Sequence, residues 1–357
     1  MPERINILSI NPGSTTTKIA VFEDEAELFR IDIAHSAEEL ARYETAAAQY
    51  PMRKHDVLGA LARQGFCLSG LGAIAARGGA LPPIQGGAYR INESMVRCLL
   101  ERPYVDHASN AAAVIAHELS LKLGIPAFIY DGITVDEMGE LARLSGMPEI
   151  PRRSVFHALN SRAVAREAAA ARGMNYESMT IIVAHLGGGI TLSVHSGGRA
   201  ADIISDDEGP FSPERAGRVP CRDLIDLCYS GRYDHAAMRR MLRGNGGVSA
   251  YLGTNDCREV EARIAAGDAE ALRVYESLAY QAAKGIGELA TVVSGAVDCI
   301  VLTGGLANST MMTSWIEKRV RFIAPVDIVP GGDELMALAL GVLRVLRGEE
   351  VEREFEE

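Results

Sequence analysis

Glycine, hydroxyl and lysine residues are grouped in one short segment near the beginning of the sequence. Gly13 and Ser14 are followed by three threonines, and Lys18 ends the group. Glycine lets backbone N–H groups approach an anion closely, while hydroxyl and ammonium groups add hydrogen-bond donors and positive charge. The segment therefore predicts a phosphate site. An ordinary hairpin turn is the alternative, because turns of this composition also join strands that bind nothing.

A similar segment occurs in the second half of the chain. Residues 7–20 align with residues 181–194 without a gap, at an offset of 174 residues. The alignment places equivalent residues in pairs: Asn11 with His185, Gly13 with Gly187, and Thr17 with Thr191. Each segment has the pattern of a strand, a tight turn and a second strand. The sequence therefore predicts a duplicated domain in which each half carries a phosphate loop.

Charged residues elsewhere have both a chemical and a structural interpretation. Asp131 follows an apolar run, and Glu334 begins a helical pattern. Carboxylate oxygens at these positions suit Mg²⁺, but they are equally suited to cap a helix or to interact with a helix dipole. Asp256 and Arg258 can form a simple surface ion pair. Cys257 is interpreted as a packing residue, because no motif would activate its thiol.

Short apolar runs alternate with longer helical patterns along the chain, which predicts an α/β fold. The expected strands cover residues 5–10, 18–22, 73–76, 127–130, 180–184, 190–195, 299–303 and 326–329. The expected helices cover residues 37–49, 93–100, 110–123, 153–172, 222–229, 269–294 and 333–347. Gly285 and Gly287 interrupt the longest helix and indicate close packing or a bend there.

The length of 357 residues predicts two domains, because a single core rarely grows beyond about 250–300 residues. A boundary is expected near residues 149–153, where two prolines precede a long helical pattern. We expect the first lobe to contain residues 1–152 together with a C-terminal helix over 333–357. The second lobe is expected to contain residues 153–332.

Composition and charge exclude several classes of protein. Hydrophobic residues make up 48% of the chain, which is too many for a disordered protein. No apolar run approaches the roughly 18–20 residues that span a bilayer, and the N-terminal residues lack a targeting pattern. We therefore expect a soluble cytoplasmic protein without a membrane partner. The six cysteines lack the spacing of a zinc site or a disulfide framework.

The net charge is −11, from 36 basic and 47 acidic residues. Such a balance argues against a nucleic-acid partner, because no basic surface is available to replace counterions. The segment Glu349–Glu357 is especially acidic, and we expect it to be the solvated end of a helix.

Several motifs together resemble those of one known family. They are INPGSTTTK at 10–18, VFHALN at 155–160, HLGGGIT at 185–191, FSPERAG at 211–217, NDCR at 255–258, TGGLAN at 303–308 and DEL at 333–335. Their order and spacing are similar to those of the acetate kinase family, within the acetate and sugar kinase, heat-shock 70 and actin superfamily. The resemblance extends from residue 7 to about 340, and it is strongest to the butyrate kinases. It implies two ribonuclease H-like domains of the actin-like ATPase type, with a nucleotide cleft between them.

The resemblance also implies roles for individual residues. The implied catalytic residues are Arg77, Asp131, His157 and Arg215. The implied nucleotide-binding residues are Asn11, Ser14, Thr16, Lys18, His185, Gly187, Gly188, Gly189, Asp256, Cys257, Arg258, Gly304, Gly305 and Asn308. The implied carboxylate-binding residues are Ala76, His107 and Phe156, and the implied Mg²⁺ ligands are Glu334 and Asp131. From the sequence pattern alone, without the resemblance, His107 is interpreted as a surface residue and Phe156 as a core residue.

Two features depart from the acetate kinase pattern. Acetate kinases have a catalytic arginine three residues before a His-Gly-Gly motif, whereas this chain has Ile74 there and Arg77 in place of the histidine. We therefore expect Arg77 to serve instead. Ala76 and Asp106 stand where bulkier apolar residues are expected, and a small residue at 76 predicts an enlarged carboxylate pocket.

The resemblance implies transfer of the ATP γ-phosphoryl group to a short-chain fatty carboxylate, with butyrate giving butyryl phosphate. The expected direction is ATP synthesis. ATP and Mg²⁺ are the expected cofactors, and the family suggests a homo-oligomer, a dimer or larger. The alternatives are a kinase for isobutyrate or another short-chain carboxylate, a sugar kinase with Asp131 as general base, and a nucleotide switch without enzymatic activity.

Overall fold

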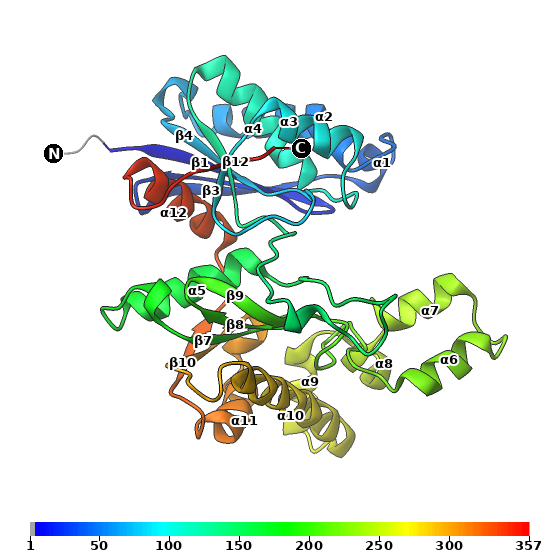
Figure 1. The fold of residues 1–357 in the computed structure, drawn as a ribbon. Helices are drawn as coiled ribbons and strands as arrows, with labels where there is room; N and C mark the ends of the chain where they lie inside the picture. Colours follow the sequence, from blue (N-terminus) through cyan, green and yellow to red (C-terminus); the bar gives the residue numbers. More distant parts are fainter. Residues whose placement is uncertain (1–3, 357) are drawn as a thin grey trace. The chain divides into compact units, whose positions relative to one another are not determined.

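The computed structural model describes residues 4–356 of the chain (Figure 1). Two compact units divide the chain, and each is described here by itself. Unit 1 contains Met1–Asp136 and Asp333–Glu357, and unit 2 contains Glu137–Gly332. Over the described residues, no helix has the length and apolar character required to cross a membrane.

Unit 1 is built on a seven-stranded mixed sheet with the order β12-β5-β6-β4-β1-β2-β3. Its strands are β1 (Asn6–Pro12), β2 (Thr16–Glu23), β3 (Ala26–Ala34), β4 (Ala73–Arg77), β5 (Ala88–Arg90), β6 (Ala127–Tyr130) and β12 (Arg353–Glu354). Strands β1, β4 and β6 are parallel, whereas β2 is antiparallel to β1, and β3 is antiparallel to β2. The carboxyl ends of three parallel strands therefore meet at one edge of this sheet.

Helices cover both faces of the unit 1 sheet (Figure 1). They are α1 (Ala37–Leu40), α2 (Tyr50–Arg63), α3 (Glu93–Glu101), α4 (Asn110–Leu123) and α12 (Glu334–Leu346). Side chains alternate between the faces of a strand. Leu8 and Ile10 of β1 accordingly join the hydrophobic core formed with α2, α3 and α4. Ser9 points to the other face, where its hydroxyl donates to the Leu335 carbonyl of α12 at 2.8 Å.

Unit 2 repeats this plan with a five-stranded sheet in the order β11-β10-β7-β8-β9. The strands are β7 (Ile181–Leu186), β8 (Ile190–Ser196), β9 (Arg199–Ile204), β10 (Cys299–Gly304) and β11 (Val326–Pro330). The helices are α5 (Ala158–Ala170), α6 (Cys221–Tyr229), α7 (His235–Leu242), α8 (Gly247–Leu252), α9 (Cys257–Ala265), α10 (Ala269–Val292) and α11 (Thr310–Val320). α5 packs on one face of the sheet, and α9, α10 and α11 contribute to the core on the other face.

Short 3₁₀ turns complete the fold at Ala47–Gln49, Leu68–Gly70, Leu141–Arg143, Tyr176–Ser178 and Gly305–Asn308. The long helix α10 runs without a break through both glycines. A Cβ atom at Gly285 would lie 2.5 Å from Leu192 of β8, whereas one at Gly287 would meet no atom within 4 Å. Close packing therefore explains Gly285 and leaves Gly287 without a structural reason.

The two sheets have equivalent strand orders, which confirms the duplication. In each unit a parallel strand, β4 or β10, lies beside the first strand of a hairpin, and a third antiparallel strand carries a bulge. The bulges fall between Val21 and Phe22 in unit 1 and between Val194 and His195 in unit 2. Their offset is 173 residues, not 174.

The gapless alignment is therefore wrong by one residue in the turn. Four residues separate the paired positions Pro12 and Thr17, whereas three separate Leu186 and Ile190. The pairing places Lys18, rather than Thr17, at the position of Thr191 in the duplicated hairpin.

The expected helix over 37–49 is also wrong. α1 begins after a capping box of Ser36 and Glu39 and already ends at Leu40, where turns and bends follow. The expected C-terminal helix over 333–357 ends at Leu346.

The acidic C-terminal tail is bound to the sheet rather than being a solvated helix end. β12 pairs in parallel with β5, and Arg90 of β5 binds Glu352 through two guanidinium nitrogens. The Phe355 side chain is buried, and its carbonyl accepts a hydrogen bond from Asn92 Nδ2 at 2.9 Å. Glu357, the last residue of the expected helix, lies outside the described residues.

The division between the units falls after Asp136, whereas the sequence placed it near residue 152. The intervening segment makes its described hydrogen bonds within unit 2. Glu137 receives hydrogen bonds from Arg162 at 2.8 Å and from the Ala200 N–H at 2.9 Å, and Gly139 N–H donates to the Ala201 carbonyl.

Candidate active site

The parallel strands of unit 1 bring three of the expected site residues to one edge of the sheet. Ile10 of β1 pairs with Ala76 of β4, and Arg77 of β4 pairs with Tyr130 of β6. Asn11, Arg77 and Asp131 thus follow one another across the carboxyl ends of adjacent strands. Ligands of open α/β sheets bind at this kind of edge.

Glu334 joins this group from the first turn of α12. Its Oε2 accepts a hydrogen bond from Asn11 Nδ2 at 2.6 Å, and its Oε1 lies 3.6 Å from Arg77 Nη2. Asp333 caps the helix by accepting from the Met336 N–H at 3.0 Å. The sequence therefore places a fixed helix N-terminus, with its acidic residue, beside the implied catalytic arginine.

Arg77 is held in a tight and largely buried position. Its Nη1 atom is buried and, among the described residues, has no hydrogen-bond partner. The glycines that follow allow this packing, because a Cβ at Gly78 would lie 2.6 Å from the Gly132 Cα and one at Gly79 would contact Asn110. Asn110 Oδ1 accepts the Ala80 N–H at 2.7 Å and fixes the end of the turn. A buried guanidinium with an unused donor is suited to bind an anion.

Asp131 is nearly fully buried, and its backbone has a positive φ of 42°. Its Oδ1 accepts the Gly87 N–H at 2.8 Å, while its own N–H donates to the Gly87 carbonyl at 3.2 Å. This reciprocal pair locks the carboxylate at the end of β6. Sequence reasoning allowed a helix cap here, but the helix that precedes β6 ends before Asp131 and no helix begins at it.

His107 lies near Arg77 but on the connection between α3 and α4. Its Nδ1 accepts the Ser109 N–H at 3.2 Å, so the neutral ring carries its proton on Nε2. Desolvation and the positive charge of Arg77 lower the pKa of His107, against the opposing effect of Asp106. His107 is therefore a neutral hydrogen-bond donor at pH 7.

The other implied pocket residues are placed differently. Ala76 is fully buried in the core on the helix α2–α4 face, whereas Arg77 points toward α12. Asp106 accepts the Ala46 N–H with both carboxylate oxygens, which explains why a polar residue stands there. Phe156 is buried in unit 2.

The first phosphate loop is open to solvent on one side. Ser14 and Thr15 are exposed, and Thr16 is half-buried. Lys18 follows on β2 and extends an exposed side chain whose Nζ lies 3.9 Å from Asp32. A surface pair at this distance restrains the lysine little, so its ammonium group is available to a ligand.

In unit 2, the second phosphate loop packs against the segment that carries Arg215. The Gly188 carbonyl accepts a hydrogen bond from the Ser212 hydroxyl at 2.5 Å and lies 3.4 Å from the Glu214 N–H. A Cβ at Gly189 would lie 3.5 Å from the Arg215 guanidinium carbon. The Arg215 guanidinium group therefore lies within van der Waals range of the loop.

A single carboxylate orients Arg215. Asp206 Oδ2 is hydrogen-bonded to Arg215 Nη1 and also accepts from Arg243 Nη2 at 2.7 Å. Arg215 Nε and Asp206 Oδ1 are both buried and, within the described part of the chain, have no hydrogen-bond partner. The buried Nε–H of Arg215 is thus a donor suited to an anion next to the phosphate loop.

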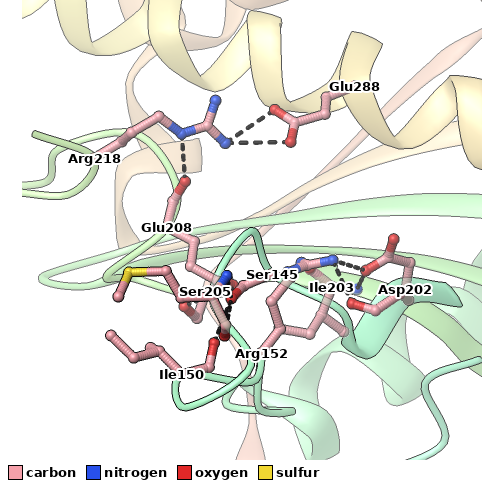
Figure 2. Close-up of polar contacts among 11 residues, drawn as sticks. Ser145, Ile150, Arg152, Asp202, Ile203, Ser205, Glu208, Arg218 and Glu288 are labelled. Atoms are coloured by element: carbon pink, nitrogen blue, oxygen red, sulfur yellow. Dashed lines mark hydrogen bonds and ion pairs between the residues drawn. The ribbon is translucent and has the colours of Figure 1, made fainter. Parts of the chain in front are cut away.

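The loop over residues 205–218 is anchored near both ends, through Glu208 and Arg218 (Figure 2). This loop contains Asp206 and Arg215. Arg218 Nε donates to the Glu208 carbonyl at 2.7 Å, and its Nη2 binds Glu288 of α10 at 3.0 and 3.2 Å. Arg152 Nε donates to the Glu208 carboxylate at 3.1 Å.

Arg152 also ties this loop to strand β9. Figure 2 shows its guanidinium group bound to Asp202 at 3.0 Å and to the Ile203 carbonyl. Ser205 completes the anchor by donating its hydroxyl to Glu208 Oε2 at 3.1 Å. Two arginines outside the implied site therefore fix the segment that presents Arg215.

His157 and His185 form a stacked pair in unit 2. Their ring centroids are 3.8 Å apart, with an angle of 9° between the ring planes. His185 Nδ1 donates to Asn160 Oδ1 of α5 at 2.6 Å, and His157 Nδ1 is hydrogen-bonded to the Thr191 hydroxyl at 2.8 Å. Each ring thus uses Nδ1 for orientation.

The implied adenosine loop begins at the end of β10, next to the second phosphate loop. Gly304 has a positive φ of 86°, and a Cβ there would collide with the Leu186 backbone of β7. Gly305 and Asn308 form a 3₁₀ turn in which Asn308 Nδ2 donates to the Gly305 carbonyl at 3.0 Å. The β7 and β10 strand ends thus bring two implied nucleotide-binding segments together.

The NDCR segment begins helix α9. Asp256 caps the helix through the Arg258 N–H at 3.0 Å, and the Arg258 side chain, which is 92% exposed, returns to the same carboxylate. These hydrogen bonds lower the pKa of Asp256 to about 2. Cys257 is buried, and burial raises the pKa of its thiol to about 12. The packing interpretation of Cys257 is supported by this environment.

No group of three or more His, Cys, Asp or Glu residues that could hold a metal occurs among residues 4–356. Asp131 and Glu334 are nevertheless carboxylates at one sheet edge and one adjacent helix end. Mg²⁺ commonly uses one or two protein carboxylates and takes its other ligands from phosphates and water. The donor set therefore fits Mg²⁺ bound together with a nucleotide.

Sequence reasoning missed the residues that support the site. In unit 2, Asn160 orients His185, and Asp206 orients Arg215. Arg243 binds the same carboxylate of Asp206. In unit 1, Arg53 of α2 contacts the first phosphate loop. Asn160 lies inside the VFHALN motif, so a signal for it was present. The others have no motif of their own.

Comparison with known proteins gives a consistent result. The model of the acetokinase family matches residues 148–324. Butyrate kinase 2 of Clostridium acetobutylicum is 45% identical over 354 residues, which cover 99% of each chain. Butyrate kinase 1 of the same organism is 45% identical over 351 residues, 98% of this chain and 99% of the relative. The crystal structure of Porphyromonas gingivalis acetate kinase has a TM-score of 0.78 at 19% identity and covers 96% of this chain and 100% of its own, which shows a shared fold.

Proposed function

The chain belongs to the acetokinase family, and from this premise we propose that it transfers the γ-phosphoryl group of ATP to butyrate. The products are butyryl phosphate and ADP. The observation that carries the proposal is the identity to butyrate kinases over nearly the whole length of both chains. The chain is accordingly an enzyme that forms an acyl phosphate from a carboxylate, and not a nucleotide switch without activity.

The chemistry of a carboxylate acceptor agrees with the groups at the site. A fatty acid has a pKa of about 4–5 and is ionised at pH 7, so it requires no general base. The barrier to the reaction is the electrostatic repulsion between the carboxylate and the negatively charged γ-phosphoryl group. Catalysis therefore depends on neutralising charge and on aligning the acceptor oxygen with the γ-phosphorus.

The described groups can divide these tasks. Arg215 presents its guanidinium group against the second phosphate loop, and Arg77 has a buried unused donor near Glu334. Either fork can bind carboxylate and phosphoryl oxygens. His107 adds a donor through its Nε2–H. The backbone N–H groups of each phosphate loop are proposed to bind nucleotide phosphates. Gly304, Gly305 and Asn308 are proposed to hold its adenosine part.

Mg²⁺ is proposed to accompany ATP, with Asp131 and Glu334 as the protein carboxylates nearest to it. The ion supplies charge neutralisation for the phosphate oxygens when it is bound. Arg77 and Asn11 fix the Glu334 carboxylate in the described contacts, and Gly87 fixes Asp131.

Net synthesis of ATP from butyryl phosphate is proposed as the cellular direction, because an acyl phosphate is a strong phosphoryl donor. The expectations of a homo-oligomer, of a cytoplasmic location and of no nucleic-acid or membrane partner stay predictions.

The acceptor can be identified with the purified protein, ATP and Mg²⁺. Hydroxylamine traps acyl phosphates as coloured hydroxamates, and the rates are compared for acetate, propionate, butyrate, isobutyrate and valerate. We expect kcat/KM for butyrate or its branched isomer to exceed that for acetate by at least about tenfold, since two methylene groups are at stake. A preference for isobutyrate would replace butyrate as the substrate, and a preference for acetate would contradict the chain-length proposal.

A further inference from the structure

Arg53 of α2 is a buried arginine without a role in the chemistry described so far. Its side chain is fully buried and is the largest fully buried side chain among the described residues. Burial of a guanidinium group is costly unless its donors are satisfied. No described hydrogen bond from Arg53 goes to a carboxylate, so an ordinary buried ion pair does not explain this position.

The hydrogen bonds of Arg53 converge on the first phosphate loop. Nη2 donates to the Ser14 carbonyl at 3.2 Å, and Nη1 donates to the Thr16 carbonyl at 3.1 Å and to the Thr17 hydroxyl at 2.8 Å. Nε and Nη2 also donate to Gln49 Oε1 at 3.1 and 2.8 Å. One guanidinium group thus spans the loop from its inner side.

His35 supports the same loop from the end of β3. Its N–H donates to the Thr15 carbonyl at 2.9 Å, and its Nε2 is hydrogen-bonded to the Thr17 hydroxyl at 2.8 Å. Its Nδ1 lies 3.4 Å from Asp56. Burial and the charge of Arg53 lower the pKa of His35, so its ring is neutral at pH 7. Thr17 then donates to His35 while it accepts from Arg53, which makes it a linker and not a nucleophile.

These contacts determine which way the peptide groups of the loop point. Three successive carbonyls accept hydrogen bonds: those of Ser14 and Thr16 from the buried Arg53, and that of Thr15 from the His35 N–H. In a trans peptide the N–H of the next residue points opposite to the carbonyl. The N–H of Thr15 is therefore turned outward, where Ser14 and Thr15 are exposed. Outward N–H groups in a turn form an anion-binding concavity.

We propose that Arg53 is a positioning residue that presets the first phosphate loop for the phosphates of ATP without contacting the nucleotide. This inference rests on the proposed function, because it assigns ATP to that loop. The positive charge of the Arg53 guanidinium group lies next to the loop carbonyls and adds to the attraction of the loop for phosphate. Lysine cannot replace it, because a single ammonium group cannot reach two carbonyls, a hydroxyl and an amide at once.

The test compares the binding of ATP and AMP by calorimetry in the full-length protein and in the Arg53→Lys variant. We expect the variant to bind ATP at least about tenfold more weakly and AMP within twofold of the unmodified protein. The KM for ATP should rise while the KM for the carboxylate stays within twofold. A ratio of affinities is independent of the folded fraction, so partial unfolding would not produce this result.

Arg63→Lys is the matched control, because Arg63 lies exposed at the other end of α2. It should change neither affinity. If Arg53→Lys fails to fold, Gln49→Met removes the anchor of the same guanidinium group and should weaken ATP binding at least threefold with AMP unchanged. An unchanged ratio of ATP to AMP affinity in a folded variant would overturn the inference. An unmodified protein that binds no ATP would instead contradict the proposed function.

Discussion

Replacement of Arg215 by alanine is expected to lower kcat about 10³-fold. An arginine that stabilises the charge of a transferring phosphoryl group contributes on that order in related chemistry, and Arg215 lies against the second phosphate loop. KM for ATP should change less than tenfold, because the glycine loop itself remains. Steady-state rates of acyl-phosphate formation in the variant measure both constants.

The structure provides a sharp control for this variant. Arg243 binds the same oxygen of Asp206 as Arg215 does, but its side chain is 53% exposed. Arg243→Ala removes one cation from Asp206 and leaves Arg215 in place, so kcat should fall less than fivefold. Asp206 keeps one arginine in either variant, and both should fold. Equal losses in the two variants would mean that the pair acts through Asp206 and not through the Arg215 guanidinium group.

Replacement of Arg77 by alanine is expected to lower kcat about 10²-fold and to raise the KM for the carboxylate. The buried Nη1 of Arg77 has no hydrogen-bond partner among residues 4–356, which leaves a donor for an anion. Loss of one preorganised donor to a developing negative charge typically costs about 10²–10³-fold. The rates are measured at saturating ATP with the carboxylate varied.

Arg90→Ala is the matched control in the same sheet. Arg90 lies on β5 in a half-exposed pair with Glu352, and such pairs contribute about 0–1 kcal/mol to stability. Its removal should leave both kinetic constants within twofold. An Arg77→Ala variant with full activity would show that another group replaces the arginine that acetate kinases have three residues earlier.

The elements that the sequence predicted well have strong and compact patterns. The strand over 127–130 and the helix over 110–123 coincide with β6 and α4, because each is an apolar segment with clear ends. Strand β3 was missed because six of its nine residues are exposed, so its hydrophobic pattern is weak. Helix α2 was missed for a related reason, since its buried stripe contains Arg53 and its first turn contains Pro51.

The candidate site was predictable where motifs lie at strand ends. The sequence identified Asn11, Arg77 and His185, and the sheets place each at the carboxyl end of a parallel strand. The exact length of the first turn was not predictable from the alignment. The first turn has one residue more than the turn of the second hairpin, so Asn11 pairs with Lys18 of β2. Only the pairing of the strands shows this difference.

The supporting residues could not be predicted, because their function arises from tertiary contacts. Arg53 is an unremarkable basic residue in the sequence, but burial against the carbonyls of Ser14 and Thr16 gives it a distinct position. Arg152 and Arg218 likewise acquire a role only through Glu208. Hydrogen bonds between residues far apart in the chain leave no spacing pattern.

The central claim is that the acceptor of the phosphoryl group is a carboxylate oxygen. It is tested most directly by ³¹P nuclear magnetic resonance of a reaction with ATP, Mg²⁺ and butyrate labelled with ¹⁸O in both carboxylate oxygens. We predict a new acyl-phosphate resonance that carries the isotope shift of one bridging ¹⁸O. Formation of inorganic phosphate alone, or of a phosphate ester when a sugar is supplied instead of butyrate, would contradict the account.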